Sequence, residues 1–206
     1  MTPRKTSIGG LLGEYERRQL KLPEFQRSYS WEKAQVATFW GDLEAFKDRY
    51  VGNPVTAAYF LGPIVVIESR TEITILDGQQ RLATATIFLA VLRDLAGETN
   101  VTTPDKDLDY FSRDVQRELI EKKDTNPLTY SLTLSELDEP FFLQTIKSSP
   151  HDAVKPRLRS HQLIKAAYDY FVEELRSRLH GKPISFFGSS GGGGGAMSWR
   201  MASKSE

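Results

Sequence analysis

Five polar or small residues, Asp77 to Arg81, stand between an apolar segment typical of a strand and one typical of a helix. Asp77 and Gln80 have the spacing of a capping box, in which each side chain bonds to the backbone of the first helical turn. That interpretation leaves Gln79 and Arg81 without a role. A cation is unfavourable at a helix N-terminus unless an anion lies in front of it. Gly78 would let a phosphate approach the backbone closely, so spacing alone leaves a cap and a phosphate site as equal alternatives.

A second polar cluster lies in the segment "LPEFQRSYSW", where an early proline excludes a continuous helix. Phe25, Tyr29 and Trp31 alternate there with Gln26 and Arg27. Consecutive side chains of an extended chain point to opposite faces, so at least one of Gln26 and Arg27 is expected to face inward and to need a partner. The alternative is that the aromatic rings belong to the core and Arg27 is a surface charge.

Composition limits the classes of function. The chain has 206 residues, 39% of them hydrophobic, and equal numbers of basic and acidic residues, 27 each. Zero net charge argues against a surface that grips nucleic acid everywhere, so any such contact is local. Basic runs at Arg17, Arg18 and Lys21 and at 155–161 are candidates, with a solvated face as the alternative. The absence of cysteine excludes disulfides, zinc thiolates and cysteine nucleophiles. With no signal or membrane segment visible, we expect a cytoplasmic protein.

The elements that position the two polar clusters follow from hydrophobic periodicity. We expect a helix from about Glu32 to Asp48, a hairpin of strands 59–68 and 73–77, and a helix over 78–95. A loop over 96–104 would end with Thr103 and Pro104 starting a charged helix, followed by a short helix from near Ser135 and a long one over 158–179. This pattern predicts an α+β fold. It divides the chain into an α+β core (1–96), a helical region (97–181) and a disordered tail rich in glycine and serine (182–206).

Three segments occur in the order "LPEFQRSYSW", "YFLGPIVV" and "ILDGQQRLAT", and "SLTLSELDEPFF" and "HQLIKAAYDYFVEEL" follow. Together they resemble the DGQQR-motif family, which includes the GmrS part of the GmrSD type IV restriction enzymes and the amino-terminal module of the SspE defence protein. The likeness covers roughly residues 7–180. It implies a ParB- or sulfiredoxin-like core, a small mixed sheet with helices, followed by a helical region. It also implies a module of a bacterial anti-phage, modification-dependent restriction system that binds and hydrolyses a nucleoside triphosphate.

The family motif maps onto Asp77, Gly78, Gln79, Gln80 and Arg81. Amides around Gly78 would hold the phosphates of GTP or ATP, and Arg81 would neutralise the charge that grows during transfer. Asp77 would bind Mg²⁺ or orient the attacking water, and either glutamine would position that water.

Two residues of the second cluster, Gln26 and Arg27, are expected to add phosphate contacts. The family's systems pair such a module with an HNH-type nuclease. No HNH-type region follows residue 181 here, so the nuclease is expected as a module in cis or in trans, and cleavage by this chain alone is not expected. Homo-oligomerisation stays open, and no membrane partner is expected.

Two other hypotheses remain from the sequence. The chain is alternatively a non-catalytic DNA-binding module that recognises phosphorothioate or modified-base DNA, with Phe25, Tyr29 and Trp31 lining the pocket. The third hypothesis is a folded fragment that acts only when the missing nuclease is supplied.

Overall fold

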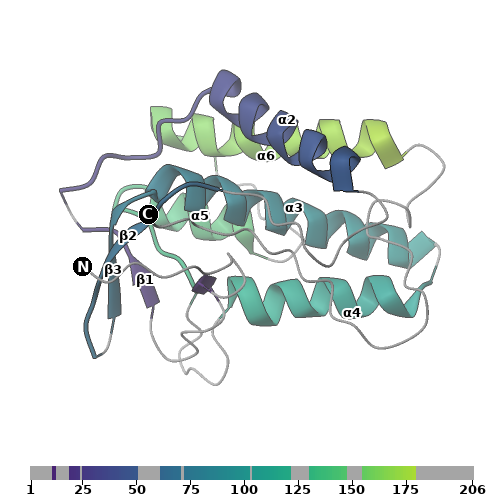
Figure 1. The fold of residues 1–206 in the computed structure, drawn as a ribbon, viewed down its shortest axis with the longest axis horizontal. Coiled ribbons are helices and arrows are strands. Elements are labelled where there is room, and N and C mark those ends of the chain that lie inside the picture. The colour runs from purple at the N-terminus through teal and green to yellow at the C-terminus, as the bar shows by residue number, and fades with distance from the viewer. Residues whose placement is uncertain are drawn as a thin grey trace.

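A small sheet lies at one end of a stack of helices, as Figure 1 shows. The computed structural model describes residues 11–12, 19–23, 25–50, 61–70, 72–102, 104–121, 130–147 and 155–179. The strands are β1 (Gln19–Lys21), β2 (Val65–Glu68) and β3 (Glu72–Asp77). The helices are α2 (Lys33–Tyr50), α3 (Gln79–Thr102), α4 (Lys106–Asp114), the π-helix η1 (Val115–Ile120), α5 (Glu139–Ile146) and α6 (Arg159–Leu179). The predicted α+β class is confirmed, as are the helices expected at 32–48 and 158–179.

The sheet is mixed, with the strand order β1-β3-β2. β1 is parallel to β3, and β2 is antiparallel to β3, which confirms the expected hairpin. The first strand of that hairpin is shorter than predicted, because residues 61–64 are not in a strand. Gly62 has a φ of 103° there and Pro63 follows it, and neither residue suits the interior of a sheet.

A short segment from the second half of the chain extends the sheet on its β1 side. Leu20 forms a parallel bridge with Leu132. The Leu20 amide donates to the Ser131 carbonyl oxygen (3.0 Å), and the Thr133 amide donates to the Leu20 carbonyl oxygen (3.0 Å). The segment 130–133 therefore runs parallel to both β1 and β3.

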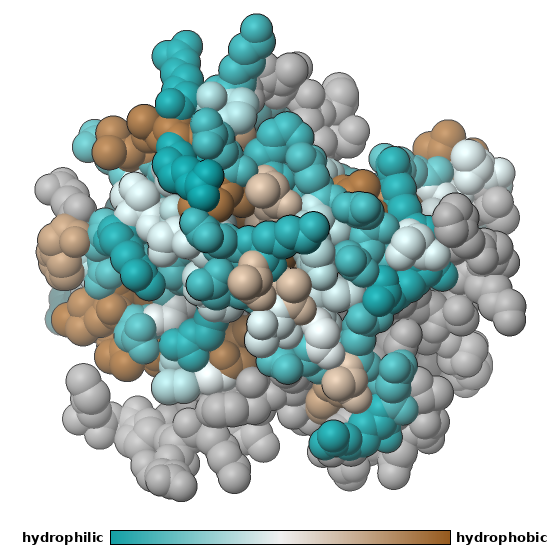
Figure 2. Space-filling model, turned by 90° about the horizontal axis from the view of Figure 1, so that it is seen from above, coloured by the Kyte–Doolittle hydropathy of each residue, from teal (hydrophilic) through white to brown (hydrophobic). Residues whose placement is uncertain are grey.

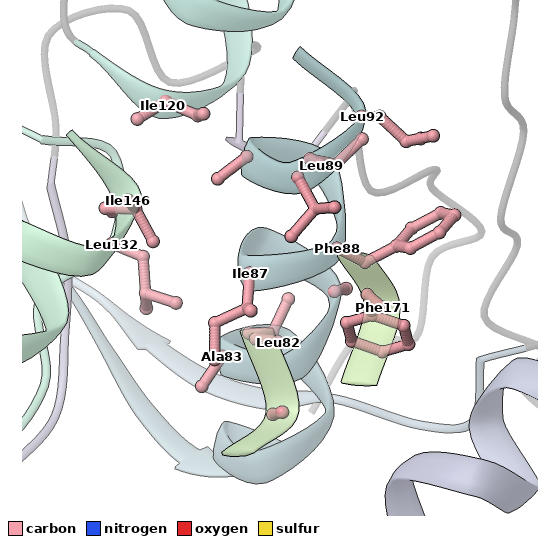
Figure 3. Close-up of a cluster of buried hydrophobic side chains, with 14 of the residues drawn as sticks. Leu82, Ala83, Ile87, Phe88, Leu89, Leu92, Ile120, Leu132, Ile146 and Phe171 are labelled. Atoms are coloured by element: carbon pink, nitrogen blue, oxygen red, sulfur yellow. The ribbon is translucent and has the colours of Figure 1, made fainter. Parts of the chain in front are cut away.

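Helix α3 is the centre of the hydrophobic core. It is buried on nearly every side from Gln79 to Ala96, as its apolar sequence predicted. Figure 3 shows Ile87 directed toward Leu132 and Ile146 on one side of α3, and Phe88 directed toward Phe171 of α6 on the other. The Phe88 and Phe171 rings meet edge to face with centroids 5.2 Å apart, a favourable geometry for aromatic pairs.

A buried arginine joins the far part of α3 to the end of α5. Arg93 is only 3% exposed and pairs with Asp94 at 2.7 Å. Its guanidinium also donates to the carbonyl oxygens of Ile146 (2.7 Å) and Lys147 (3.0 Å). Both carbonyl oxygens lie at the C-terminus of α5, where they have no partner within the helix and where a cation is electrostatically favoured.

Helix α3 continues to Thr102, so the loop predicted over 96–104 is wrong for residues 96–102. This end of α3 packs against α4, where Gly97 faces the Ser112 side chain. The expected start of the next helix is also wrong. Asp105, not Thr103, caps α4 by accepting hydrogen bonds from the amides of Asp107 (2.7 Å) and Leu108 (3.4 Å). The predicted boundary at residue 96 lies inside α3.

The outer face above α2 and α6 is mainly hydrophilic, with scattered apolar side chains, as Figure 2 shows. Among the helices of the described ranges, none combines the length and the apolar character needed to cross a membrane. Near the N-terminus, only Leu11 and Leu12 are described before β1, and both are helical and buried. The predicted tail, 182–206, lies outside the described residues.

Candidate functional site

Three parallel segments end at the same edge of the extended sheet. The chain leaves β1 at Leu22, leaves β3 at Gly78, and leaves the bridging segment at Leu134. Open sheets of α/β proteins commonly bind ligands in the crevice outside the carboxyl ends of parallel strands. A pocket of about 190 Å³, its open mouth included, lies at this edge. It is lined by Leu22, Arg27, Tyr29, Gln79, Gln80, Ala83, Leu134, Ser135 and Asp138.

Gly78 forms the turn between β3 and α3. Its φ is 93°, and its carbonyl oxygen accepts the first hydrogen bond of the helix, from the Leu82 amide (3.0 Å). A Cβ at this position would lie 2.9 Å from Cγ1 of Ile64, so both the backbone conformation and the available space require glycine.

The predicted capping box is wrong. Asp77 is the last residue of β3 rather than the helix cap, and Gln80 bonds to a different part of the chain. The Asp77 carboxylate is 66% exposed and pairs with the Arg81 guanidinium at 3.3 Å. A cation at a helix N-terminus is unfavourable without a nearby anion, and the Asp77 carboxylate supplies that anion to Arg81.

Three glutamine side chains hold residues 26–30, here called the strap, across the start of α3. Oε1 of Gln80 accepts from the Ser30 amide (2.8 Å), and its Nε2 donates to the Ser28 carbonyl oxygen (3.2 Å). Nε2 of Gln79 donates to the Arg27 carbonyl oxygen (2.9 Å). From the strap itself, Nε2 of Gln26 donates to the carbonyl oxygen of Leu76 in β3 (3.0 Å).

These bonds show how the two sequence clusters come together. Of the pair expected to face opposite ways, Gln26 faces the sheet, while Arg27 is exposed at the pocket. The strap is irregular rather than a strand.

Arg81 lies in a space that a second glycine provides. Its guanidinium donates to the Leu61 carbonyl oxygen (3.4 Å) and packs so closely on Gly62 that a Cβ there would overlap it. An exposed pair such as Arg81–Asp77 contributes only about 0.3–0.5 kcal/mol, so Arg81 can exchange Asp77 for another anion. Sequence reasoning missed Gly62; its only signal was a glycine inside an apparent strand.

The far wall of the pocket comes from the turn 135–138, which sequence reasoning also missed. Asp138 is fully buried, and its carboxylate accepts from the Tyr29 amide (2.8 Å) and from the Ser160 hydroxyl. It thereby links the strap to the first turn of α6. Asp138 precedes α5 as a cap residue would, but it makes no cap bond with its side chain, which the sequence could not reveal.

Two polar atoms at the pocket have no partner among the described residues. They are Oε1 of Gln79, a residue that is 7% exposed, and Oγ of Ser135. Buried polar atoms are nearly always hydrogen-bonded to protein or ordered water, so each such exception calls for an explanation.

The aromatic residues of the strap region do not form one apolar pocket. Phe25 is 81% exposed, and Trp31 packs against Phe39 with ring centroids 6.4 Å apart. Of these three aromatic residues, only Tyr29 lines the pocket. Burial raises the pKa of the Tyr29 hydroxyl, which is hydrogen-bonded to Thr84 at 2.8 Å, so the group stays neutral.

The metal-ligand donors in this part of the chain are sparse. The described residues contain no group of three histidine, cysteine or acidic residues able to hold a metal ion, and the exposed Asp77 carboxylate at the end of β3 does not line the pocket. His161 is buried, stacked on Phe141 and hydrogen-bonded to the Leu137 carbonyl oxygen (3.0 Å). His151 and His180 lie outside the described residues.

The fold and the crevice define an α+β module that carries a polar site at the carboxyl ends of parallel strands. The family model of the GmrSD restriction endonuclease N-terminal domain matches residues 8–197. The chain therefore belongs to this family and is a module of a restriction system. A search of curated proteins found no match.

Proposed function

We propose that the chain is the nucleoside-triphosphate-binding and -hydrolysing sensor module of its restriction system, gating a DNA nuclease module. The observation that carries the proposal is the start of α3: the helix begins at Gly78 where three parallel segments end, Arg27 lines the adjacent pocket, and Arg81 belongs to the first helical turn. A helix N-terminus and nearby guanidinium groups favour a phosphate there.

The size of the pocket limits which part of a nucleotide it takes. Its enclosed space is about that of one water molecule, far below the roughly 300–1,000 Å³ of pockets that enclose a whole small ligand. The terminal phosphate therefore lies at the mouth of the pocket, with room for one water molecule behind it, and the base and sugar lie further out, toward the exposed Arg27 and Phe25.

Each motif residue then has a distinct task. Arg81 leaves Asp77 and neutralises the terminal phosphate as charge develops on it. Gln79, with its free Oε1, contacts the attacking water, whereas Gln80 and Gln26 keep the strap in place. A single exposed carboxylate, Asp77, suits Mg²⁺, which is commonly held by one or two carboxylates, substrate phosphates and water. The ion would neutralise phosphate charge.

The test is release of inorganic phosphate from GTP and from ATP with Mg²⁺. We expect Arg81→Ala to lower the rate at least about 100-fold, as removal of a charge-stabilising donor does, and Asp77→Ala to weaken the Mg²⁺ dependence. Arg176→Ala is the matched control, because Arg176 pairs with Glu98 on the surface away from the crevice. Equal rates in all four proteins would refute the proposal.

A second candidate function is a non-catalytic reader of modified DNA. The observation in its favour is the exposed set around Phe25 and Arg27, together with the exposed Lys155 and Arg157 near the start of α6. This candidate predicts salt-sensitive binding to phosphorothioate or modified-base duplexes, weaker binding to plain duplexes, and no nucleotide turnover. Equal affinity for both duplexes would refute it.

A further inference from the structure

The two unpaired polar atoms of the pocket come from different elements of the fold. Gln79 comes from the first turn of α3, and Ser135 from the turn that follows the bridging segment. The sequence separates them by more than fifty residues, and the parallel pairing of Leu20 with Leu132 brings their segments to the same sheet edge.

The chemistry of these atoms selects the group that fits between them. The amide nitrogen of Gln79 already donates to Arg27, so its Oε1 only accepts hydrogen bonds. A phosphate oxygen, which is also only an acceptor, cannot satisfy it. A water molecule can donate to Gln79 and still exchange a hydrogen bond with the Ser135 hydroxyl, and polar cavities of this kind hold ordered water.

Ser135 is held in place independently of any ligand. Its carbonyl oxygen accepts from the amides of Asp138 (2.9 Å) and Glu139 (2.8 Å), which fixes the turn. Asp138 is in turn fixed by Tyr29 and Ser160. Because the turn already holds the Ser135 hydroxyl in position, no protein rearrangement is needed when the reaction occurs, as is required of a group that positions water.

We propose that Gln79 and Ser135 form the subsite of the attacking water, a specific assignment that rests on the proposed nucleotide hydrolysis. The water oxygen forms a bond to the γ-phosphorus while the bond from that phosphorus to the β–γ bridging oxygen breaks. The bridging oxygen leaves with the nucleoside diphosphate. One water proton stays on the phosphate product and the other passes to solvent. Ser135 contacts the water and not the nucleotide, so its loss affects turnover and not substrate binding.

The chain offers a matched control for Ser135. Ser131 lies in the same segment, and its hydroxyl is likewise buried and unpaired among the described residues, but it does not line the pocket. Ser135→Ala and Ser131→Ala each remove an unsatisfied hydroxyl, so neither is expected to lower the thermal midpoint.

The experiment compares kcat and KM of the wild type, Ser135→Ala and Ser131→Ala for the nucleotide that the wild type hydrolyses fastest. We expect kcat of Ser135→Ala to fall about tenfold or more, the effect of one hydrogen bond made in the transition state, with KM and the thermal midpoint unchanged. Ser131→Ala should match the wild type.

Three results would overturn the water subsite. The first is an unchanged kcat in Ser135→Ala while the wild type is active, which leaves the proposed function standing. The second is a raised KM with unchanged kcat, which would make Ser135 a substrate contact. The third is a wild type that hydrolyses neither GTP nor ATP, which removes the proposed function and this inference together.

Discussion

The two adjacent glutamines of the DGQQR turn are equally buried, at 7% exposed each, yet the structure gives them opposite energetic roles. Replacing each one separately with leucine, which has a similar volume, tests this difference. Gln80 satisfies both ends of its amide through Ser30 and Ser28. Gln79 satisfies only its nitrogen, through Arg27, and leaves its oxygen unpaired.

The magnitudes follow from the hydrogen bonds that are lost. Gln80→Leu removes two bonds and leaves a donor and an acceptor of the strap unpaired in partly buried positions, which costs about 2–3 kcal/mol. Gln79→Leu removes one bond worth about 1 kcal/mol, but it also removes an unsatisfied oxygen whose burial costs about as much. The expected change for Gln79→Leu is therefore near zero. A difference of about 2 kcal/mol corresponds to about 4–8 °C in Tm for a chain of this length.

Urea and thermal unfolding of both variants, alongside phosphate release, measure the two effects. We expect Gln80→Leu to unfold at lower temperature and lower urea concentration. Gln79→Leu should unfold like the wild type while its kcat falls at least about tenfold. If Gln79→Leu is as unstable as Gln80→Leu, the assignment of Gln79 to the ligand and Gln80 to the strap is refuted.

Three further predictions concern other parts of the structure. Gly62→Ala should displace the Arg81 guanidinium and reduce hydrolysis toward the level of Arg81→Ala, and a normal rate would contradict the close packing of these residues. Arg93→Met should lower the free energy of unfolding by about 3–5 kcal/mol in urea titrations, because it leaves the buried Asp94 without its cation; a loss below about 1 kcal/mol would contradict this. Burial raises the pKa of Tyr29 above its ordinary 10.0, so above pH 10 the unfolded chain releases a proton that the folded chain keeps, and stability falls. The fall should be steeper in the wild type than in Tyr29→Phe by about 1.4 kcal/mol per pH unit, and equal slopes would argue against it.

Periodicity predicted the elements whose burial pattern is strong. Helix α3 carries apolar residues on nearly every side and was recognised as a buried helix, and the hairpin β2–β3 was recognised from its branched residues. The end of α3 was missed because glycine and polar residues from Gly97 onward suggested a loop. Packing against α4 overrides that local preference.

Only part of the site could be predicted from the sequence. Arg27 was predicted to lie beside the motif, and the structure brings it to the pocket with Gln79 and Gln80, whereas Asp77, Gly78 and Arg81 do not line that pocket. Ser135 and Asp138 were not predicted, because their position depends on the parallel bridge between Leu20 and Leu132, a long-range pairing that leaves no local pattern. Asp77 and Gln80 resembled a capping box by spacing, and only the hydrogen bonds to the strap show the actual partners of Gln80 and Gln79.

A crystal structure with Mg²⁺ and a non-hydrolysable triphosphate analogue tests the central claim most directly. The account predicts the terminal phosphate at the start of α3, contacting the backbone at Gly78 and the Arg81 guanidinium, with Asp77 released from its ion pair and a water between Gln79 and Ser135. A nucleotide bound elsewhere, with the Arg81–Asp77 pair intact and the crevice closed by the strap, would contradict it.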